Sequence, residues 1–255
     1  MGKVAAIQMT AGSDIQVNLN KALDMIRSAA DSGAQLIVLP EMFQTGFTMD
    51  VNDVAEPMNL TTFKWMKQMA AQKKAVVTGS YIVKEKGQAF NRLILMQPDG
   101  EYYTYDKRHL FRMANEDKDF SMGMERLIVE LKGWKICPMI CYDLRFPVWS
   151  RNRNQEYDLL LYVANWPASR AHIWDTLLKA RSIENLAYSI GVNRVGKDGK
   201  DIDYVGHTGA YSPKGETLTF SEEEELILLD LSLDDLKAFR ERFPAHLDAD
   251  EFELK

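Results

Sequence analysis

Residues 136–147 read ICPMICYDLRFP, an apolar run that stops abruptly at a cysteine. An uncharged run of this length is typical of a buried strand. The polar pair Tyr142-Asp143 follows directly after Cys141. In layered α/β proteins, ligands gather where the carboxyl ends of strands meet loops. The segment therefore predicts an α/β fold with Cys141 at an edge where such a fold binds ligands.

Three other apolar runs end in the same way, and each delivers a polar side chain to a strand end. Residues 36–40 precede Glu41, residues 102–105 precede Asp106 and Lys107, and residues 159–164 precede Asn165 and Trp166. These side chains and Cys141 are therefore expected to form one site.

The remaining sequence alternates strand-like and helical patterns. Apolar residues at helical spacing predict helices at about 18–32, around 63–69 and at 171–185, and Ser232 is placed to cap a last short helix. Strands are expected at 4–9, 35–39, 75–83, 187–195 and 225–231, with hairpins across 91–105 and 126–140 and a turn at 211–216. Hairpins mixed with crossovers imply an α/β domain in which two sheets pack together and helices lie outside.

The composition fits one large globular unit. With 255 residues and 46% hydrophobic content, we expect a single domain over residues 1–255, with a short polar tail from about residue 244. A net charge of −6 with scattered basic residues argues against a nucleic-acid partner. The start of the chain lacks a signal-peptide pattern, and no apolar stretch reaches the roughly 20 residues that span a bilayer. We therefore expect no membrane association and a cytoplasmic location.

The chain has two cysteines, Cys137 and Cys141. If one strand holds both, they lie on the same face, two strand repeats apart and too far for a disulfide. No other Cys or His pair has metal-ligand spacing, so neither a metal nor another cofactor is expected. Cys137 is expected to lie in the core. A cysteine that ends an apolar run, such as Cys141, is more often a small buried hydrophobic residue than a nucleophile.

The residue types at the strand ends nevertheless fit nucleophilic attack on a carbonyl carbon. A thiol attacks as the thiolate, and Glu41 is suited to accept its proton. Lys107 and the backbone N–H of Tyr142 are suited to stabilise the resulting oxyanion. Taken singly, Glu41 also fits a salt bridge and Lys107 a solvated surface. None of the four histidines has a context that favours a Cys-His mechanism, and His109 is expected to bond to backbone.

Three segments resemble the catalytic blocks of the nitrilase superfamily, in that family's order and spacing. They are LPEM at 39–42, YDKRHLF at 105–111 and ICYDLRFP at 140–147. Further similarity lies at 179–185 and 206–216, and the resemblance extends over about residues 3–240. It implies a four-layer α-β-β-α sandwich that pairs through its helical face as a homodimer or higher homo-oligomer.

By this resemblance, Cys141 is the nucleophile, Glu41 the general base and Lys107 the lysine that stabilises the oxyanion. The family carries a second glutamate on the loop after the lysine, which orients the lysine and helps position the substrate amide. Glu116 fits this glutamate best by its offset from the residues that follow, and Glu125 is the alternative.

Within the family, FQTGF at 43–47 and ANWP at 164–167 look most like the bacterial omega-amidases. Those enzymes hydrolyse the distal amide of short dicarboxylate monoamides such as 2-oxoglutaramate. The resemblance thus implies a small-molecule amide as the substrate.

Such a substrate needs a small pocket and a cation for its far carboxylate. Phe47 and Trp166 are suited to wall the pocket, and Arg145 or Arg170 to bind the carboxylate. Both arginines also fit the alternative of structural ion-pair residues.

Several functional alternatives remain open at this stage. Other aliphatic amidases, N-carbamoyl amino acid hydrolases and nitrilases use the same residues, and pocket shape separates their substrates. A catalytically inactive scaffold or binding protein of the same fold is a non-enzymatic alternative. The complete set of Glu41, Lys107, Glu116 and Cys141 argues against it.

Overall fold

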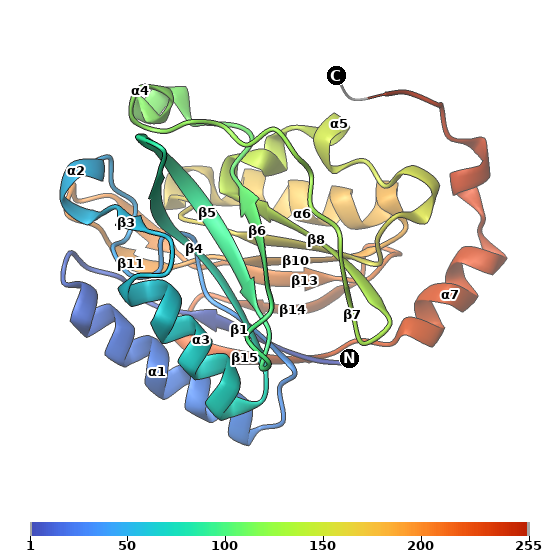
Figure 1. The fold of residues 1–255 in the computed structure, drawn as a ribbon. Coiled ribbons are helices and arrows are strands. Elements are labelled where there is room, and N and C mark those ends of the chain that lie inside the picture. Colours follow the sequence, from blue (N-terminus) through green and yellow to red (C-terminus); the bar gives the residue numbers. More distant parts are fainter. Residues whose placement is uncertain (1, 254–255) are drawn as a thin grey trace.

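The computed structural model describes residues 2–253, in which two β-sheets pack face to face (Figure 1). The first sheet has seven strands in the order β15-β1-β2-β4-β5-β6, with the short β3 beside β4. They are β1 (Lys3–Gln8), β2 (Leu36–Val38), β3 (Glu56–Pro57), β4 (Val76–Glu85), β5 (Gln88–Met96), β6 (Tyr102–Asp106) and β15 (Glu225–Asp230). β1, β2 and β4 are parallel, and β15, β5 and β6 pair antiparallel at the edges.

The second sheet repeats this plan with six strands in the order β14-β13-β10-β9-β8-β7. They are β7 (Val129–Leu131), β8 (Trp134–Ile140), β9 (Leu159–Val163), β10 (Tyr188–Val192), β13 (Thr208–Tyr211) and β14 (Thr217–Ser221). Its three central strands β8, β9 and β10 are parallel, so their carboxyl ends meet at one edge. A separate hairpin joins β11 (Val195–Lys197) to β12 (Asp203–Val205).

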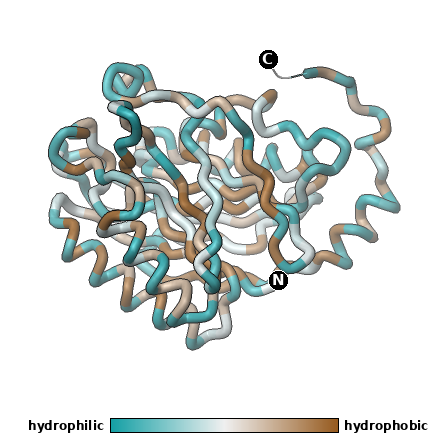
Figure 2. The backbone as a smooth tube through the Cα atoms, viewed as in Figure 1, coloured by the Kyte–Doolittle hydropathy of each residue, from teal (hydrophilic) through white to brown (hydrophobic). Residues whose placement is uncertain are grey.

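Helices cover the outer faces of both sheets. α1 (Ile15–Asp31) and α3 (Thr61–Lys73) lie side by side on the first sheet, and α6 (Ala171–Asn185) covers the second (Figure 1). Figure 2 shows hydrophobic and hydrophilic residues alternating along the coil of α1, as expected for a helix with one face on a sheet. The remaining helices are α2 (Val51–Val54), α4 (Glu116–Asp119), α5 (Pro147–Ser150) and α7 (Leu233–Arg242). These layers confirm the predicted α-β-β-α sandwich.

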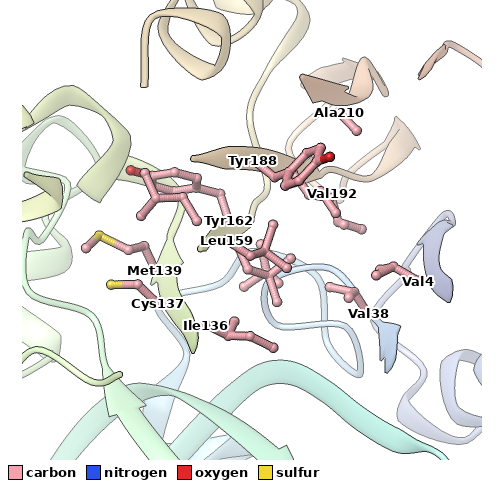
Figure 3. Close-up of a cluster of buried hydrophobic side chains, with 14 of the residues drawn as sticks. Val4, Val38, Ile136, Cys137, Met139, Leu159, Tyr162, Tyr188, Val192 and Ala210 are labelled. Atoms are coloured by element: carbon pink, nitrogen blue, oxygen red, sulfur yellow. The ribbon is translucent and has the colours of Figure 1, made fainter. Parts of the chain in front are cut away.

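The core follows from the alternation of side chains along each strand. In β1, Val4 and Ala6 belong to the cluster between the sheets, whereas Ala5 and Ile7 belong to the cluster beneath α1 and α3. Figure 3 shows part of the inter-sheet core, to which both sheets contribute: Val4 and Val38 from the first, and Ile136, Leu159 and Val192 from the second. Each fully buried Val or Ile contributes about 1.5–3 kcal/mol relative to an exposed one.

The structure departs from the predicted elements mainly in the last third of the chain. β10 ends at Val192 instead of continuing to 195, because the N–H of Asn193 donates to the hydroxyl of Thr208. The hairpin β11–β12 and the strand β14 were not predicted. The cap was predicted correctly, since Ser232 accepts the N–H of Asp235 at the start of α7. No helix within residues 2–253 is long and apolar enough to cross a membrane.

The two cysteines do not share a strand, because β8 ends at Ile140, where the predicted hairpin also ends. Cys141 begins a 3₁₀ turn, η2 (Cys141–Arg145). Both cysteines are free and buried. The face on which Cys137 lies within β8 therefore says nothing about the direction of the Cys141 side chain.

Candidate active site

Cys141 lies at the edge of the second sheet where its parallel strands end. Its φ of 46° places it in the left-handed region, which is unfavourable for a residue with a Cβ. Only 8% of its surface is exposed, and its Sγ lies 4.0 Å from the carbonyl oxygen of Asn165. The residue lines a cavity of about 390 Å³. The turn thus presents a nearly buried thiol to a space that fits a small molecule.

A buried cluster of opposite charges lies beside this thiol. The Nζ of Lys107, which follows β6, is 3.0 Å from Glu41 Oε1 and 2.9 and 3.0 Å from the two carboxylate oxygens of Glu116. Each of these three side chains is at most 1% exposed. The structure therefore brings Glu41, Lys107 and Glu116 together, as the sequence predicted. Glu125 is exposed and lines a different cavity, so it does not take the place of Glu116.

Hydrogen bonds hold both carboxylates of the cluster in place. Asn91 Nδ2 donates to Glu41 Oε1 over 2.7 Å, and the backbone N–H of Asn165 donates to Glu41 Oε2 over 2.7 Å. The backbone N–H of Phe111 donates to Glu116 Oε2 over 2.6 Å. The sequence placed Asn165 at this site but missed Asn91, whose one signal was an amide inside a buried strand.

The electrostatics keep the lysine charged and the thiol protonated at rest. Burial by itself lowers the pKa of Lys107, but the charges of Glu116 and Glu41 outweigh it and raise the pKa above its ordinary value. Burial raises the pKa of Cys141 well above its ordinary value, Glu41 raises it further and Lys107 opposes them. Burial also raises the pKa of Glu116, against the opposing charge of Lys107. The thiol therefore needs a proton acceptor at the moment of attack.

The walls of the cavity contain all four side chains that the sequence proposed for substrate binding. They are Phe47, Trp166, Arg145 and Arg170, and Tyr142 lines the cavity as well. The guanidinium of Arg145 lies 5.3 Å from the ring centroid of Trp166, and that of Arg170 lies 5.3 Å from the ring of Phe111. Neither arginine forms a salt bridge within the described part of the chain. The alternative that they are structural ion-pair residues is therefore not supported.

Sequence reasoning missed part of the cavity lining. The missed part consists of residues 113–115 and of residues from the β11–β12 hairpin, namely Asp198, Lys200, Ile202 and Tyr204. The hairpin lies far in sequence from the catalytic blocks. The dipeptide Asp198-Gly199, a common hairpin turn, was the one signal that could have indicated it.

His109 does not bond to backbone through its ring, contrary to the sequence expectation. Its Nδ1 lies 2.8 Å from Asp143 Oδ1, and its ring stacks on Phe146 with centroids 3.8 Å apart. A buried carboxylate two residues after Cys141 competes better for an imidazole N–H than a carbonyl oxygen does.

Comparisons with known proteins agree with this geometry. Residues 3–241 match the family described as carbon-nitrogen hydrolase. The chain is similar to Omega-amidase YafV of Yersinia enterocolitica, with 48% identity over 243 residues that cover 94% of this chain and 93% of that protein. It is 30% identical to 2-oxoglutaramate amidase of Bacillus subtilis over 232 residues, 89% of each chain. A CN-hydrolase superfamily protein of Xanthomonas campestris, solved with an arsenic adduct in its active site, has a TM-score of 0.97 and 41% identity, with 100% of this chain and 99% of that chain covered.

Proposed function

The chain belongs to the carbon-nitrogen hydrolase family, and within this family we propose that it is an omega-amidase that acts on short dicarboxylate monoamides such as 2-oxoglutaramate. The observation that carries the proposal is one cavity lined by the thiol of Cys141 and by the two arginines Arg145 and Arg170. A thiol beside a carboxylate and an ammonium group is suited to cleave an amide. Cations in the same cavity are suited to bind a carboxylate on the substrate. The names of the two amidase relatives support the same substrate class.

In the first half of the proposed reaction, the sulfur of Cys141 attacks the amide carbon while Glu41 accepts the thiol proton. The ammonium group of Lys107 and the backbone N–H of Tyr142 stabilise the tetrahedral oxyanion. The C–N bond then breaks, Glu41 returns its proton to the leaving nitrogen, and ammonia departs. A thioester on Cys141 remains. Glu116 holds Lys107 in place through the contacts of 2.9 and 3.0 Å.

In the second half, Glu41 accepts a proton from water, and the resulting hydroxide attacks the thioester carbon. The C–S bond breaks, and the departing sulfur takes the proton from Glu41. The products are the dicarboxylate and the restored thiol. The same base therefore acts in both halves, which fits the two hydrogen bonds of 2.7 Å that fix both of its oxygens.

The two arginines are suited to recognise the far carboxylate. A guanidinium that lies on an aromatic ring keeps its N–H edge available for a bidentate contact. Without such a cation, a carboxylate that enters a partly apolar cavity loses its hydration without compensation. The arginines therefore give the proposed enzyme a preference for acidic amides over neutral ones of the same length.

A substrate panel read out by ammonia release tests the function. We expect the pure protein to hydrolyse 2-oxoglutaramate and succinamate with a kcat/KM roughly ten- to a hundredfold above that of butyramide, since one charge-assisted contact contributes about 1.5–3 kcal/mol. An N-carbamoyl amino acid and a short nitrile belong in the same panel and separate the other family activities. Equal kcat/KM values for succinamate and butyramide would remove the omega-amidase assignment.

Arginine variants identify the carboxylate contact. Arg145→Ala or Arg170→Ala is expected to raise KM for succinamate and to leave butyramide hydrolysis nearly unchanged. Arg112→Ala is the matched control, because Arg112 begins the 3₁₀ turn Arg112–Ala114, is 80% exposed and pairs with Asp117, and neither residue lines the cavity. If all three variants behave alike, the carboxylate is bound elsewhere.

Three expectations from the sequence accompany this proposal. The single-domain organisation, the cytoplasmic location and the homo-oligomeric state stay predictions. Light scattering on the purified protein measures the last of them directly.

A further inference from the structure

We propose that Asp143 is a positioning residue that fixes the sulfur of Cys141 relative to the ammonium group of Lys107, an inference that rests on the function proposed above. Asp143 lies two residues after Cys141 in η2, and its side chain is fully buried. In the proposed reaction, this carboxylate neither accepts nor donates a proton and forms no bond. Its four hydrogen bonds instead connect the segments that carry the two reacting groups.

The first connection closes the turn that carries the nucleophile. The backbone N–H of Ile140, the residue before Cys141, donates to Asp143 Oδ2 over 3.0 Å. The carboxylate thus bridges from one side of Cys141 to the other. A non-glycine residue keeps a left-handed φ, here 46°, only where its surroundings enforce it.

The second connection reaches the segment that carries Lys107. Tyr105 Oη donates to Asp143 Oδ2 over 2.7 Å, and the backbone N–H and Nδ1 of His109 lie 2.9 and 2.8 Å from Asp143 Oδ1. Tyr105 and His109 flank Lys107, two residues before and two residues after it. One buried carboxylate therefore connects the turn that carries Cys141, after β8, to the residues on both sides of Lys107, which follows β6.

An asparagine cannot replace this carboxylate, although it has the same shape. Every group that faces Asp143 is a donor, and two of them are backbone N–H groups, one on each side. Whichever way an amide is turned, its NH₂ group faces one of these N–H donors. Asp143→Asn therefore breaks the connection without opening a cavity.

The test measures how strongly Lys107 acts on Cys141, by alkylation with iodoacetamide. Below the pKa of the thiol, the alkylation rate at a fixed pH follows the thiolate fraction. Lys107 lowers the pKa of Cys141, so Lys107→Met is expected to slow alkylation by a measurable factor. In the D143N protein, the factor by which Lys107→Met slows alkylation should be less than half of its value in the protein with Asp143, because Lys107 and Cys141 no longer keep their spacing. An undiminished factor in the D143N background would overturn the proposal.

The matched control is Asp158→Asn, which changes another buried aspartate, located directly before β9. Asp158 accepts from Arg240 over 2.7 Å and from the N–H of Lys135 over 3.0 Å, at the opposite end of the strands. Asp158→Asn should lower the stability of the protein and leave the factor by which Lys107→Met slows alkylation of Cys141 unchanged. If D143N and Asp158→Asn reduced the effect of Lys107→Met on alkylation equally, any buried carboxylate would have this influence. The positioning role of Asp143 would then be rejected.

Two variants of His109 keep the proposal testable if the D143N protein does not fold. Asparagine places its side-chain NH₂ where the histidine has Nδ1, whereas glutamine extends past that point. In the His109→Asn protein, Lys107→Met should therefore slow alkylation of Cys141 by the same factor as before. In the His109→Gln protein, this factor should be smaller. In steady state, His109→Gln should lower kcat and leave KM nearly unchanged. A smaller alkylation factor for His109→Asn than for His109→Gln would overturn the proposal.

Alkylation needs no amide substrate, so the two proposals fail separately. A protein that releases no ammonia from any amide in the panel loses the omega-amidase assignment. The alkylation factors still decide the role of Asp143.

Discussion

Cys137 and Cys141 lie four residues apart, and their surroundings are opposite in kind. Cys137 is inside β8 with no exposed surface, packed into the hydrophobic cluster that includes Met139 and Tyr162 (Figure 3). Cys141 is one residue beyond the strand, and its thiol lies beside Glu41 and Lys107. Over this short separation, the same residue type is once a core side chain and once a candidate nucleophile.

The comparison shows that burial does not distinguish the two thiols. Burial raises the pKa of Cys137 to about 12 and that of Cys141 well above its ordinary value. The charge on Arg126 is too weak an influence to offset burial at Cys137. At Cys141, a fixed carboxylate is available to take the proton when the sulfur attacks. The difference is therefore a proton acceptor beside the thiol, supplied by the other sheet.

The largest expected effect comes from removing each sulfur in turn. Cys141→Ala should abolish ammonia release and leave the thermal midpoint nearly unchanged, because this residue lies at the edge of the core and lines the cavity. Cys137→Ala should keep most of the rate and lose about 1 kcal/mol of stability, or roughly 2–4 °C in Tm for a chain of this size. Steady-state assays and thermal unfolding of both variants measure this. Wild-type turnover in Cys141→Ala would end the thioester mechanism.

Glu41→Gln should come next, with both half-reactions lost. The amide keeps the shape of the side chain but cannot accept a proton from the thiol or from water. A single-turnover experiment with an activated ester separates the halves, since an ester needs less help to acylate the thiol. The variant should accumulate the acyl-enzyme, visible by mass spectrometry. Turnover that stays near the wild-type rate would assign the base to another group.

Lys107→Met should lower kcat by about 10²-fold or more, the usual loss when one oxyanion donor is removed. The apolar side chain fills the space, although it leaves the buried carboxylates of Glu41 and Glu116 without their cation. Thermal unfolding must therefore accompany the kinetics, because uncompensated buried charge costs about 3–5 kcal/mol. A folded variant with unchanged kcat would place the oxyanion elsewhere.

Sequence patterns predicted the layers and the meeting of Glu41 and Lys107 at one site because both depend on local signals, whereas Glu116 was identified only through the family resemblance. Apolar runs mark buried strands, and each run that ends in a polar residue marks the site edge. The patterns placed the end of the strand at Ile140 correctly, but they did not indicate the left-handed backbone conformation of Cys141. They also missed Asp143 and the hairpin β11–β12, whose roles arise from contacts between segments distant in sequence. Contacts of this kind produce no periodic pattern of hydrophobic and polar residues in the sequence.

Glu116 provides a smaller test of the same comparison. Glu116→Ala should lower kcat roughly tenfold, since misplacement of a reacting group by a fraction of an ångström is costly. It removes the two contacts of 2.9 and 3.0 Å between Glu116 and the Nζ of Lys107. Glu125→Ala is the control, because Glu125 is exposed and should leave kinetics unchanged. Equal kinetics for the two variants would reduce Glu116 to a structural partner of Phe111.

The smallest expected effect is a change in the alkylation rate of Cys141 at a fixed pH below the pKa of its thiol. The charge of Glu41 raises this pKa and that of Lys107 lowers it. Glu41→Gln should therefore lower the pKa, increase the thiolate fraction and speed the reaction with iodoacetamide, whereas Lys107→Met should slow it. Cys137 should stay unmodified in every folded variant, since it has no exposed surface and a pKa of about 12. Peptide mapping by mass spectrometry assigns the modified residue.

If Glu41→Gln instead slowed alkylation of Cys141, the carboxylate of Glu41 would also be acting as a base in the reaction with iodoacetamide. The difference in reactivity between the two cysteines would then come from proton transfer alone, and the charges of Glu41 and Lys107 would not contribute to it.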